Sequence, residues 1–265
     1  MGLLNDRIIR GLILDMDGVL WRDQQPIGDL PSIFLRINHL GLRVTLATNN
    51  ATLHAEKFQE KLSLFGVNID LWQIITSSQA TAEYLARLYP SGGPVFIIGE
   101  EGLVNSLSEH HFYIDETQPL AVVVGLDRNL TYKKLSKATL LIRSGVPFIG
   151  TNPDRTLPTP EGLIPGSGSI LSAIEAASDI KPILIGKPAS KMYQIALDRL
   201  GLLPDETLVV GDRIETDIVG AVTLGCRTAL VLSGATSMEA AYSYSPPPDL
   251  ICTDLDHVIQ SIHPS

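Results

Sequence analysis

A set of short apolar runs, each stopping at polar residues, constrains the fold of this 265-residue chain more than any other feature. The four clearest are Gly11-Leu12-Ile13-Leu14 before Asp15, Val44-Thr45-Leu46-Ala47 before Thr48, Ile183-Leu184-Ile185 before Gly186-Lys187, and Leu208-Val209-Val210 before Gly211-Asp212. Continuous apolar runs bounded by turn residues are typical of strands buried on both faces of a parallel sheet. Helical patterns lie between them, at residues 33–40 and at 190–200, where Ser190 is the expected N-cap. The alternation predicts an α/β fold.

The long stretch between the second and third runs has strands and helices of its own. We expect strands at 94–98, 120–124 and 146–149, and helices near 131–143 and 169–177. A stretch of this length is about the size of a small domain. The sequence therefore predicts a core domain of residues 1–78 and 181–265, with a second α/β domain inserted at residues 79–180.

The charge balance and the cysteines limit the class of protein. Acidic residues number 29 against 20 basic ones, and the net charge of −9 disfavours nucleic acid and anionic membrane surfaces as partners. No apolar run approaches the roughly 18 residues of a membrane helix, and the first residues are too polar for a signal peptide. Cys226 and Cys252 give no disulfide framework, so we expect both to be buried thiols of a cytoplasmic protein.

The segment Asp15-Met16-Asp17-Gly18 directly follows the first apolar run. Gly18 permits a turn there, and a turn would let both carboxylates serve one site. Because the carboxyl ends of parallel strands meet at one crevice, Asp212 and Asp217 are expected nearby. So many carboxylates require a cation, and an all-oxygen ligand set suits Mg²⁺.

Phosphate-binding groups are expected at the same crevice. Thr48 and Asn49 offer a hydroxyl, an amide and backbone N–H groups, while Lys187 is a point charge suited to phosphate. Together with a cation and Asp15, they describe a phosphoryl-transfer site with an aspartate nucleophile.

Four motifs in order resemble those of haloacid-dehalogenase-superfamily phosphatases. They are Asp15-Met16-Asp17-Gly18-Val19-Leu20-Trp21, Thr48-Asn49-Asn50, Gly186-Lys187-Pro188 and Gly211-Asp212-Arg213-Ile214-Glu215-Thr216-Asp217-Ile218. The resemblance spans nearly the whole chain. It is strongest to the para-nitrophenylphosphatase and phosphoglycolate-phosphatase-like subgroup, whose large α/β cap is of class IIA. Thr151-Asn152-Pro153-Asp154 in the insertion is similar to part of that cap.

The resemblance implies a role for each matching residue. It implies that Asp15 is the nucleophile, that Asp17 is the general acid and base, and that Asp15, the Asp17 carbonyl and Asp212 hold Mg²⁺ with support from Asp217. Thr48, Asn49 and Lys187 would bind the phosphoryl group, and Asn50, Asn152 and Asp154 would meet the rest of the substrate. Small phosphomonoesters are the expected substrates: sugar, glycolate or nucleotide phosphates, and 4-nitrophenyl phosphate in vitro. A homodimer formed through the cap is also expected.

Two alternatives to a phosphatase remain at this level. A mutase or other phosphotransferase differs only in the acceptor, so it fits the same motifs. A receiver-like signalling module also carries a phosphorylated aspartate, a Thr and a Lys at strand ends, but it needs less than half this length and lacks an acid at the position of Asp17. The identity of the ester does not follow from the motifs, nor does a role of Trp21 or of the Gly166–Ser169 turn in contacting it.

Overall fold

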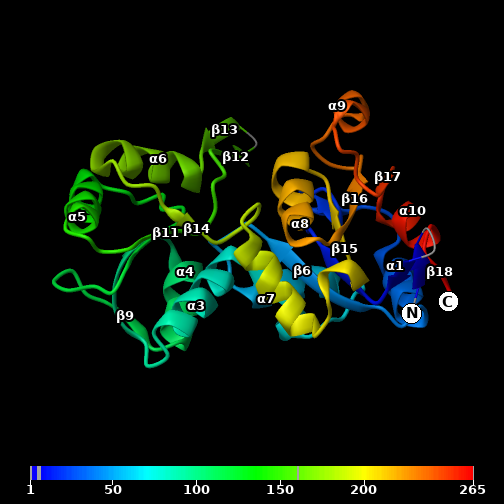
Figure 1. Ribbon diagram of the computed structural model, residues 1–265, viewed down its shortest axis with the longest axis horizontal. Helices are drawn as coiled ribbons and strands as arrows, with labels where there is room; N and C mark the ends of the chain where they lie inside the picture. Colours follow the sequence, from blue (N-terminus) through cyan, green and yellow to red (C-terminus); the bar gives the residue numbers. More distant parts are fainter. Residues whose placement is uncertain (1, 5–6, 160, 265) are drawn as a thin grey trace. The chain divides into compact units, whose positions relative to one another are not determined.

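The computed structural model describes residues 2–4, 7–159 and 161–264. The chain divides into two compact units (Figure 1). Unit 1 consists of residues 1–48, 55–75 and 187–265, and unit 2 consists of residues 49–54 and 76–186. Within the described ranges, none of the helices combines the length and the apolar character needed to cross a bilayer.

Unit 1 is built on a six-stranded sheet with the order β17-β16-β15-β3-β6-β7. In chain order these strands are β3 (Gly11–Leu14), β6 (Arg43–Thr48), β7 (Ile74–Thr76), β15 (Thr207–Gly211), β16 (Arg227–Val231) and β17 (Leu250–Cys252). The strands from β17 to β6 run parallel. From β3, the chain adds β6 and β7 on one side of the sheet and β15, β16 and β17 on the other, so the strand order reverses between β3 and β15. Parallel α/β sheets bind ligands at the carboxyl edge of such a switch point.

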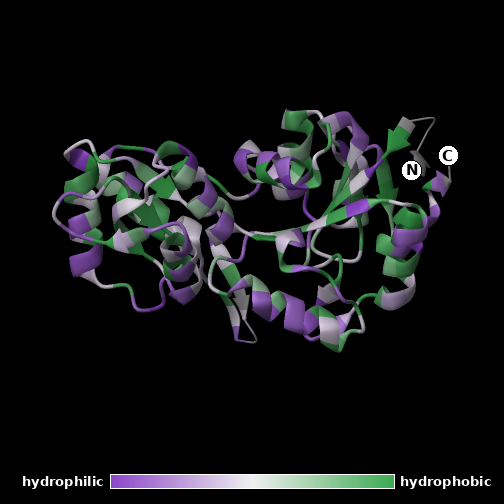
Figure 2. Ribbon diagram, turned by 90° about the horizontal axis from the view of Figure 1, so that it is seen from below, coloured by the Kyte–Doolittle hydropathy of each residue, from purple (hydrophilic) through white to green (hydrophobic). Residues whose placement is uncertain are grey.

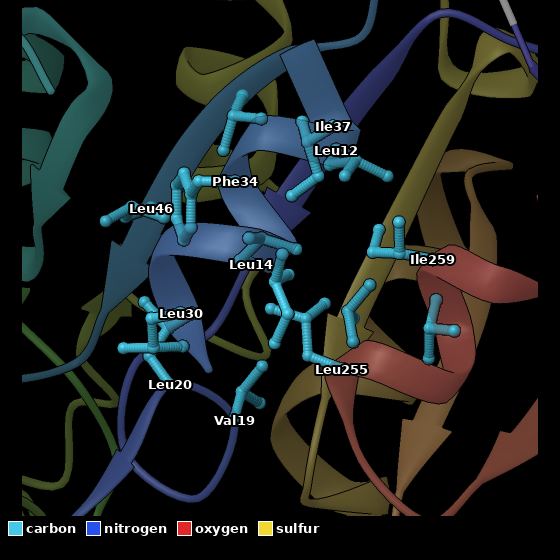
Figure 3. Close-up of a cluster of buried hydrophobic side chains, with 14 of the residues drawn as sticks. Leu12, Leu14, Val19, Leu20, Leu30, Phe34, Ile37, Leu46, Leu255 and Ile259 are labelled. Carbon is cyan, nitrogen blue, oxygen red and sulfur yellow. The ribbon is translucent and has the colours of Figure 1, made fainter. Parts of the chain in front are cut away.

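The two faces of this sheet are covered by different helices, which explains why its strands read as continuous apolar runs. Leu12 and Leu14 of β3 pack on α1 (Leu30–His39), α2 (Ala55–Leu64) and α10 (Leu255–Gln260), as Figure 3 shows for α1 and α10. Ile13 points to the other face, where α7 (Ser190–Leu200) contacts β3 and β6, and α8 (Val219–Leu224) contacts β16. Both cysteines are buried free thiols, as expected from the sequence.

Two helix starts differ from the sequence-based expectation. Helix α1 begins at Leu30, earlier than residue 33, because the Asp29 side chain accepts a hydrogen bond from the backbone N–H of Ser32 and Pro31 fits the first turn. Helix α7 does begin at Ser190, but its N-cap is Ala189, so the prediction that Ser190 caps this helix is wrong.

Unit 2 contains a five-stranded parallel sheet with the order β14-β11-β10-β8-β9. Its strands are β8 (Gly93–Ile98), β9 (Phe112–Ile114), β10 (Val122–Val124), β11 (Phe148–Gly150) and β14 (Ile183–Leu184), and its helices are α3 (Ser77–Leu88), α4 (Glu101–Glu109), α5 (Tyr132–Arg143) and α6 (Ser167–Ser178). Phe96, Val122 and Val124 form a core with residues of α5 and α6. The strands are mostly hydrophobic, whereas the helices alternate between the two colours in Figure 2, as one-sided burial requires.

The division of the chain differs from the expected one at two places. Ile183 and Leu184 do form a strand, but β14 pairs with β11 in the sheet of unit 2 and not with the strands of unit 1. Lys187 therefore follows a strand of unit 2 and begins the last segment of unit 1. Residues 49–54 also cluster with unit 2, although they directly follow β6.

Short antiparallel pairs and turns of helix complete the chain. They are β1 (Gly2–Leu4), β2 (Arg7–Ile9) and β18 (His263–Pro264) in one small sheet, the hairpins β4 (Trp21–Arg22) with β5 (Gln25–Pro26) and β12 (Thr156–Thr159) with β13 (Gly162–Pro165), the helix α9 (Met238–Ser243), the 3₁₀ turns η1 (Leu71–Gln73) and η2 (Pro204–Glu206), and the π-helical turn η3 (Ile214–Ile218).

Candidate active site

Asp15 and Asp212 lie at the switch point of the unit 1 sheet, one residue beyond neighbouring strands. The backbone N–H of Asp15 still donates to the Val210 carbonyl of β15 (2.9 Å), so the ladder holds the first aspartate against the second strand. Gly18, three residues on, adopts a left-handed conformation (φ +83°) that turns the chain back after β3. A Cβ at this position would overlap the Asp212 carboxylate, so only glycine fits between the two loops.

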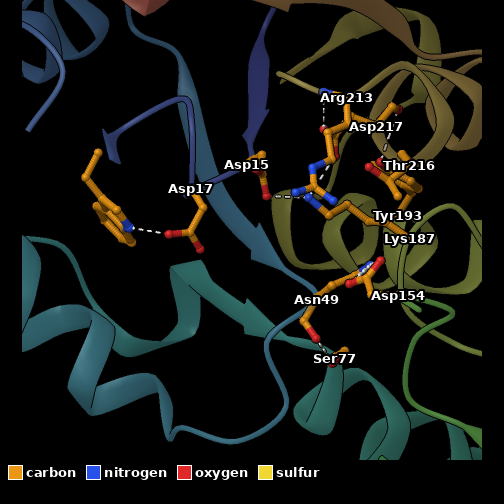
Figure 4. A network of polar contacts seen from close by, with 11 residues as sticks. Asp15, Asp17, Asn49, Ser77, Asp154, Lys187, Tyr193, Arg213, Thr216 and Asp217 are labelled. Atoms are coloured by element: carbon orange, nitrogen blue, oxygen red, sulfur yellow. Dashed lines mark hydrogen bonds and ion pairs between the residues drawn. The ribbon is translucent and has the colours of Figure 1, made fainter. Parts of the chain in front are cut away.

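Lys187 joins two of the buried carboxylates. Its ammonium group donates to Asp15 Oδ1 and to Asp217 Oδ1, the latter at 2.8 Å (Figure 4). The side chains of Lys187 and Asp217 are only 5% and 2% exposed, and that of Asp15 is 12% exposed. Such ion pairs are screened little by solvent, so their geometry governs the local electrostatics.

Asp217 is positioned by the π-helical turn η3. Its Oδ2 accepts from the backbone N–H of Arg213 (3.1 Å), and its backbone carbonyl accepts from the Tyr193 hydroxyl (3.1 Å). The same hydroxyl lies 3.1 Å from the Thr216 carbonyl. Tyr193, which is buried on α7, therefore fixes the backbone of η3 through two of its carbonyls. π-Helical turns recur at functional sites because they redirect one side chain out of the helical pattern.

Asp212 is held by backbone N–H groups of the segment that follows β16. Its Oδ2 accepts from the backbone N–H of Ala235 (2.6 Å), and its own carbonyl accepts from the N–H of Thr236 (3.1 Å). One carboxylate oxygen from each of Asp15, Asp212 and Asp217 lies within 4.8 Å of the others. This oxygen-only set is suited to a hard divalent cation.

The charges of the cluster do not balance without a cation. Burial raises the pKa of Asp15 well above its usual value, against the opposing effect of Lys187, and Asp217 and Asp212 raise it further. Burial and the neighbouring Asp217 also raise the pKa of Asp212. Burial disfavours the charged form of Lys187, but Asp15 and Asp217 outweigh it and raise its pKa well above the ordinary value. The raised pKa values of Asp15 and Asp212 thus come from burial first and from neighbouring carboxylates second, whereas the neighbouring carboxylates raise that of Lys187 against burial. Three carboxylates facing one ammonium group fit a divalent metal.

Asp17 differs from the other aspartates because it is exposed. Its Oδ1 accepts a hydrogen bond from the indole N–H of Trp21 (2.8 Å), the last residue of the first motif. Thr48 ends β6 in unit 1 and is buried. Asp15, Lys187, Asp212 and Asp217 are thus brought together within unit 1, with Asp17 two residues from Asp15.

The remaining site candidates lie in unit 2, where Asn49, Asn152 and Asp154 contact one another. The Asn49 amide donates to the Asp154 carboxylate (3.1 Å to Oδ2), and the Asn49 carbonyl accepts from the Asn152 amide (2.8 Å) and from the Ser77 hydroxyl (2.6 Å). Asn152 is buried, and its Oδ1 accepts from the Asp154 N–H (3.1 Å). Asn50 Oδ1 accepts from the N–H of Thr52 (2.9 Å).

Three contributors to this site escape sequence reasoning. Tyr193 follows Met192 in an apolar helical pattern and reads as core, while Ala235 acts through its backbone N–H and carries no side-chain signal. The sequence shows Trp21 as an aromatic residue near the aspartates, but only the structure shows that it donates a hydrogen bond to Asp17.

A parallel α/β sheet with a lysine and three carboxylates at its switch point is suited to phosphoryl transfer. Residues 12–113 match the family model of haloacid dehalogenase-like hydrolases, and residues 184–258 match a second model of hydrolases of this type. The acid sugar phosphatase of Staphylococcus saprophyticus is 33% identical over 254 residues, which cover 96% of this chain and 98% of that protein. This chain therefore belongs to the haloacid dehalogenase-like hydrolases.

Solved structures agree with this assignment. The p-nitrophenyl phosphatase of Archaeoglobus fulgidus superposes with a TM-score of 0.90 at 31% identity, covering 96% of this chain and 99% of that one. NagD of Escherichia coli K-12 gives a TM-score of 0.88 at 30% identity, covering 94% and 98% of the two chains.

These likenesses confirm the expected family and fold, a parallel-sheet core with an inserted α/β cap of class IIA, and they confirm an enzyme of the phosphatase class. The alternative of a non-enzymatic receiver-like module is therefore excluded.

Proposed function

We propose that the protein is a Mg²⁺-dependent phosphatase that hydrolyses small phosphomonoesters through an aspartyl-phosphate intermediate on Asp15. One observation carries the proposal: the Lys187 ammonium binds Asp15 and Asp217 beside Asp212, at the switch point of the sheet. A carboxylate is a weak nucleophile toward a phosphate dianion unless nearby cations neutralise the negative charge.

In the first step, the Asp15 carboxylate attacks phosphorus and the bond from phosphorus to the ester oxygen breaks. Asp15 Oδ1 is bound by Lys187, which leaves Oδ2 for the attack. The leaving alkoxide takes a proton from the Asp17 carboxyl group. Asp17 suits this part because it is exposed while Asp15 is largely buried.

In the second step, Asp17 accepts a proton from water as the water oxygen attacks phosphorus. The bond between phosphorus and Asp15 then breaks, so that phosphate leaves and both aspartates return to their first state. Lys187 stabilises the charge on Asp15 in both steps because its ammonium stays within hydrogen-bonding distance of that carboxylate. Bound Mg²⁺ would supply charge neutralisation for the phosphoryl oxygens.

The remaining assignments complete the proposed site. Asp15, the carbonyl of Asp17 and Asp212 would hold the metal, with Asp217 acting through Lys187. Thr48, Asn49 and Lys187 would bind the transferred phosphoryl group, and Asn50, Asn152 and Asp154 would meet the rest of the ester. The acid sugar phosphatases among the relatives make sugar phosphates the first esters to test, followed by glycolate and nucleotide phosphates. A homodimer formed through unit 2 and a cytoplasmic location stay predictions.

The test measures phosphate release from 4-nitrophenyl phosphate and a panel of natural esters, with Mg²⁺ and with excess chelator. We expect activity only with Mg²⁺ and none from Asp15→Asn. Acid quenching during turnover, followed by borohydride reduction and mass spectrometry, should reveal an acyl phosphate at position 15 of the wild-type chain. Turnover by Asp15→Asn, or a phosphoryl group on another residue, would refute the mechanism. Transfer of the label to a second sugar in place of water would favour the mutase alternative.

A further inference from the structure

The geometry points to Trp21 as a positioning residue for Asp17. Trp21 lies in the short strand β4, and its carbonyl accepts from the Gly18 N–H (2.8 Å), which closes the loop that directly follows Asp17. The indole is 1% exposed, yet its N–H reaches the exposed Asp17 carboxylate at 2.8 Å. A buried, rigid donor thus holds one oxygen of a solvent-facing acid.

The indole ring of Trp21 is held in place by Lys61 and Phe65. The Lys61 ammonium of α2 lies 4.2 Å from the ring centroid and donates to the Asp23 carbonyl (2.7 Å). Phe65 packs against the same ring with centroids 6.2 Å apart and planes tilted by 50°. Cation–π and aromatic contacts restrict the ring, so the direction of its N–H is set by packing and not by Asp17.

A fixed indole donor determines which oxygen of Asp17 can carry a proton. The indole nitrogen only donates hydrogen bonds, so Asp17 Oδ1 must accept, and the unprotonated oxygen is the better acceptor. The bond therefore favours Oδ2 as the oxygen that carries the proton given to the leaving group and later taken from water. Trp21 keeps Oδ2 in one orientation through both steps, and this inference rests on the proposed function, in which Asp17 is the acid and base.

The test compares Trp21→Phe with a matched control, Trp72→Phe. Trp72 also donates its indole N–H to an aspartate, Asp70 Oδ2 at 3.3 Å, but it is 48% exposed and distant in the sequence from the first motif. The readout is kcat/KM at constant pH and saturating Mg²⁺ for phosphate esters whose leaving groups range from 4-nitrophenol to simple alcohols. Poor leaving groups need the proton most, and acid–base assistance is worth on the order of 10²–10⁴-fold.

We expect Trp21→Phe to lower kcat/KM by about 10-fold or more for alkyl phosphates and by about 2-fold or less for 4-nitrophenyl phosphate. Trp72→Phe should leave both values unchanged. Because phenylalanine is smaller and leaves space beside Phe65, a second variant replaces Trp21 with benzothienylalanine, which keeps the ring size and puts sulfur in place of the N–H. The same dependence on the leaving group is expected from it.

The outcomes separate this inference from the proposed function. Equal losses across the ester series, or no loss, in the benzothienylalanine variant would overturn the positioning role of Trp21. Asp17→Asn, measured in parallel, should show the steepest dependence on the leaving group. If Asp17→Asn shows none, the acid–base role of Asp17 fails, and with it both proposals. If Asp17→Asn behaves as expected while the Trp21 variants do not, only the inference about Trp21 is refuted.

Discussion

Replacing Lys187 by methionine should cost far more stability than removing an ordinary surface lysine. Lys187→Met keeps an apolar stem of similar length but leaves Asp15 and Asp217 without their ammonium partner, and these side chains are 12% and 2% exposed. Breaking a buried ion pair by removing one partner typically costs about 3–5 kcal/mol. With a urea m-value of about 3 kcal/mol/M, the unfolding midpoint should fall by about 1 M or more.

The stability that Lys187→Met loses should depend on pH. Asp15 and Asp217 raise the pKa of Lys187 in the folded protein against the effect of burial. The ion pairs of Lys187 therefore contribute their full stabilisation below the pKa of the unfolded lysine, and this stabilisation is lost only as the pH rises through the folded pKa. The whole penalty of the variant is therefore expected at pH 7. Burial raises the pKa of Asp15, so protonation of that carboxyl group removes part of the uncompensated charge. The difference between variant and wild type should shrink as the pH falls toward 4.

The assay is urea unfolding followed by circular dichroism, in excess chelator so that no metal replaces the ammonium. The matched control is Lys134→Met, because Lys134 also pairs with a buried aspartate, Asp127 (2.6 Å), but is 38% exposed. Asp127 also accepts from the Asn129 N–H, so this variant should lose half as much or less. Adding Asp217→Asn to Lys187→Met should restore part of the stability. An unchanged midpoint for Lys187→Met, or a deficit that persists unchanged at pH 4, would contradict the reasoning.

Three further predictions concern Gly18, the carboxylate cluster and the buried thiol of Cys226. Gly18→Ala and Gly28→Ala both place a side chain at positive φ (+83° and +73°), but only the Gly18 variant overlaps Asp212. In urea unfolding, Gly18→Ala should therefore lose ~1–3 kcal/mol more than Gly28→Ala. Gly18→Ala should also lose most of kcat/KM, whereas Gly28→Ala should stay active. Mg²⁺ at about 100 times its dissociation constant should stabilise the wild type by ~2.7 kcal/mol in thermal melting, and Asp212→Asn should remove most of that gain unless the carboxylate cluster is not the metal site. Burial raises the pKa of the Cys226 thiol to about 12, so Ellman's reagent at pH 8 should modify it only after unfolding, and rapid modification of Cys226 in the native protein would disprove its burial.

The parts of the fold that sequence reasoning predicted correctly are those in which a local pattern has one structural meaning. The apolar runs of β3, β6 and β15 indicate strands buried on both faces, and such strands place Asp15 and Asp212 at one edge of a sheet. The order of the sheet adds what the pattern lacks, because it puts β3 directly beside β15.

The parts that were not predictable depend on distant segments. Ile183-Leu184 reads as a strand, but nothing in two apolar residues specifies that β14 pairs with β11 and not with a strand of unit 1. The hydrogen bond from Trp21 to Asp17 requires a ring already packed by α2, and the turn η3 that aims Asp217 at Lys187 is rare enough that an ordinary helix is the natural expectation. The catalytic and binding roles of the site residues stay predictions until the variants are measured.

Unit 2 separates the segments of unit 1 along the chain, and this order has a consequence for synthesis on the ribosome. Strand β3 can pair with β6 before unit 2 is made, but β15, its partner on the other side, emerges only after the whole of unit 2. The nascent chain therefore carries β3 with one unpaired, apolar edge while unit 2 is already complete enough to fold. Asp15 gains Lys187, Asp212 and Asp217 as neighbours only after unit 2 has been synthesised. A nascent chain that ends within unit 2 thus has no assembled carboxylate cluster, and hence no place to capture a metal ion or a phosphate ester.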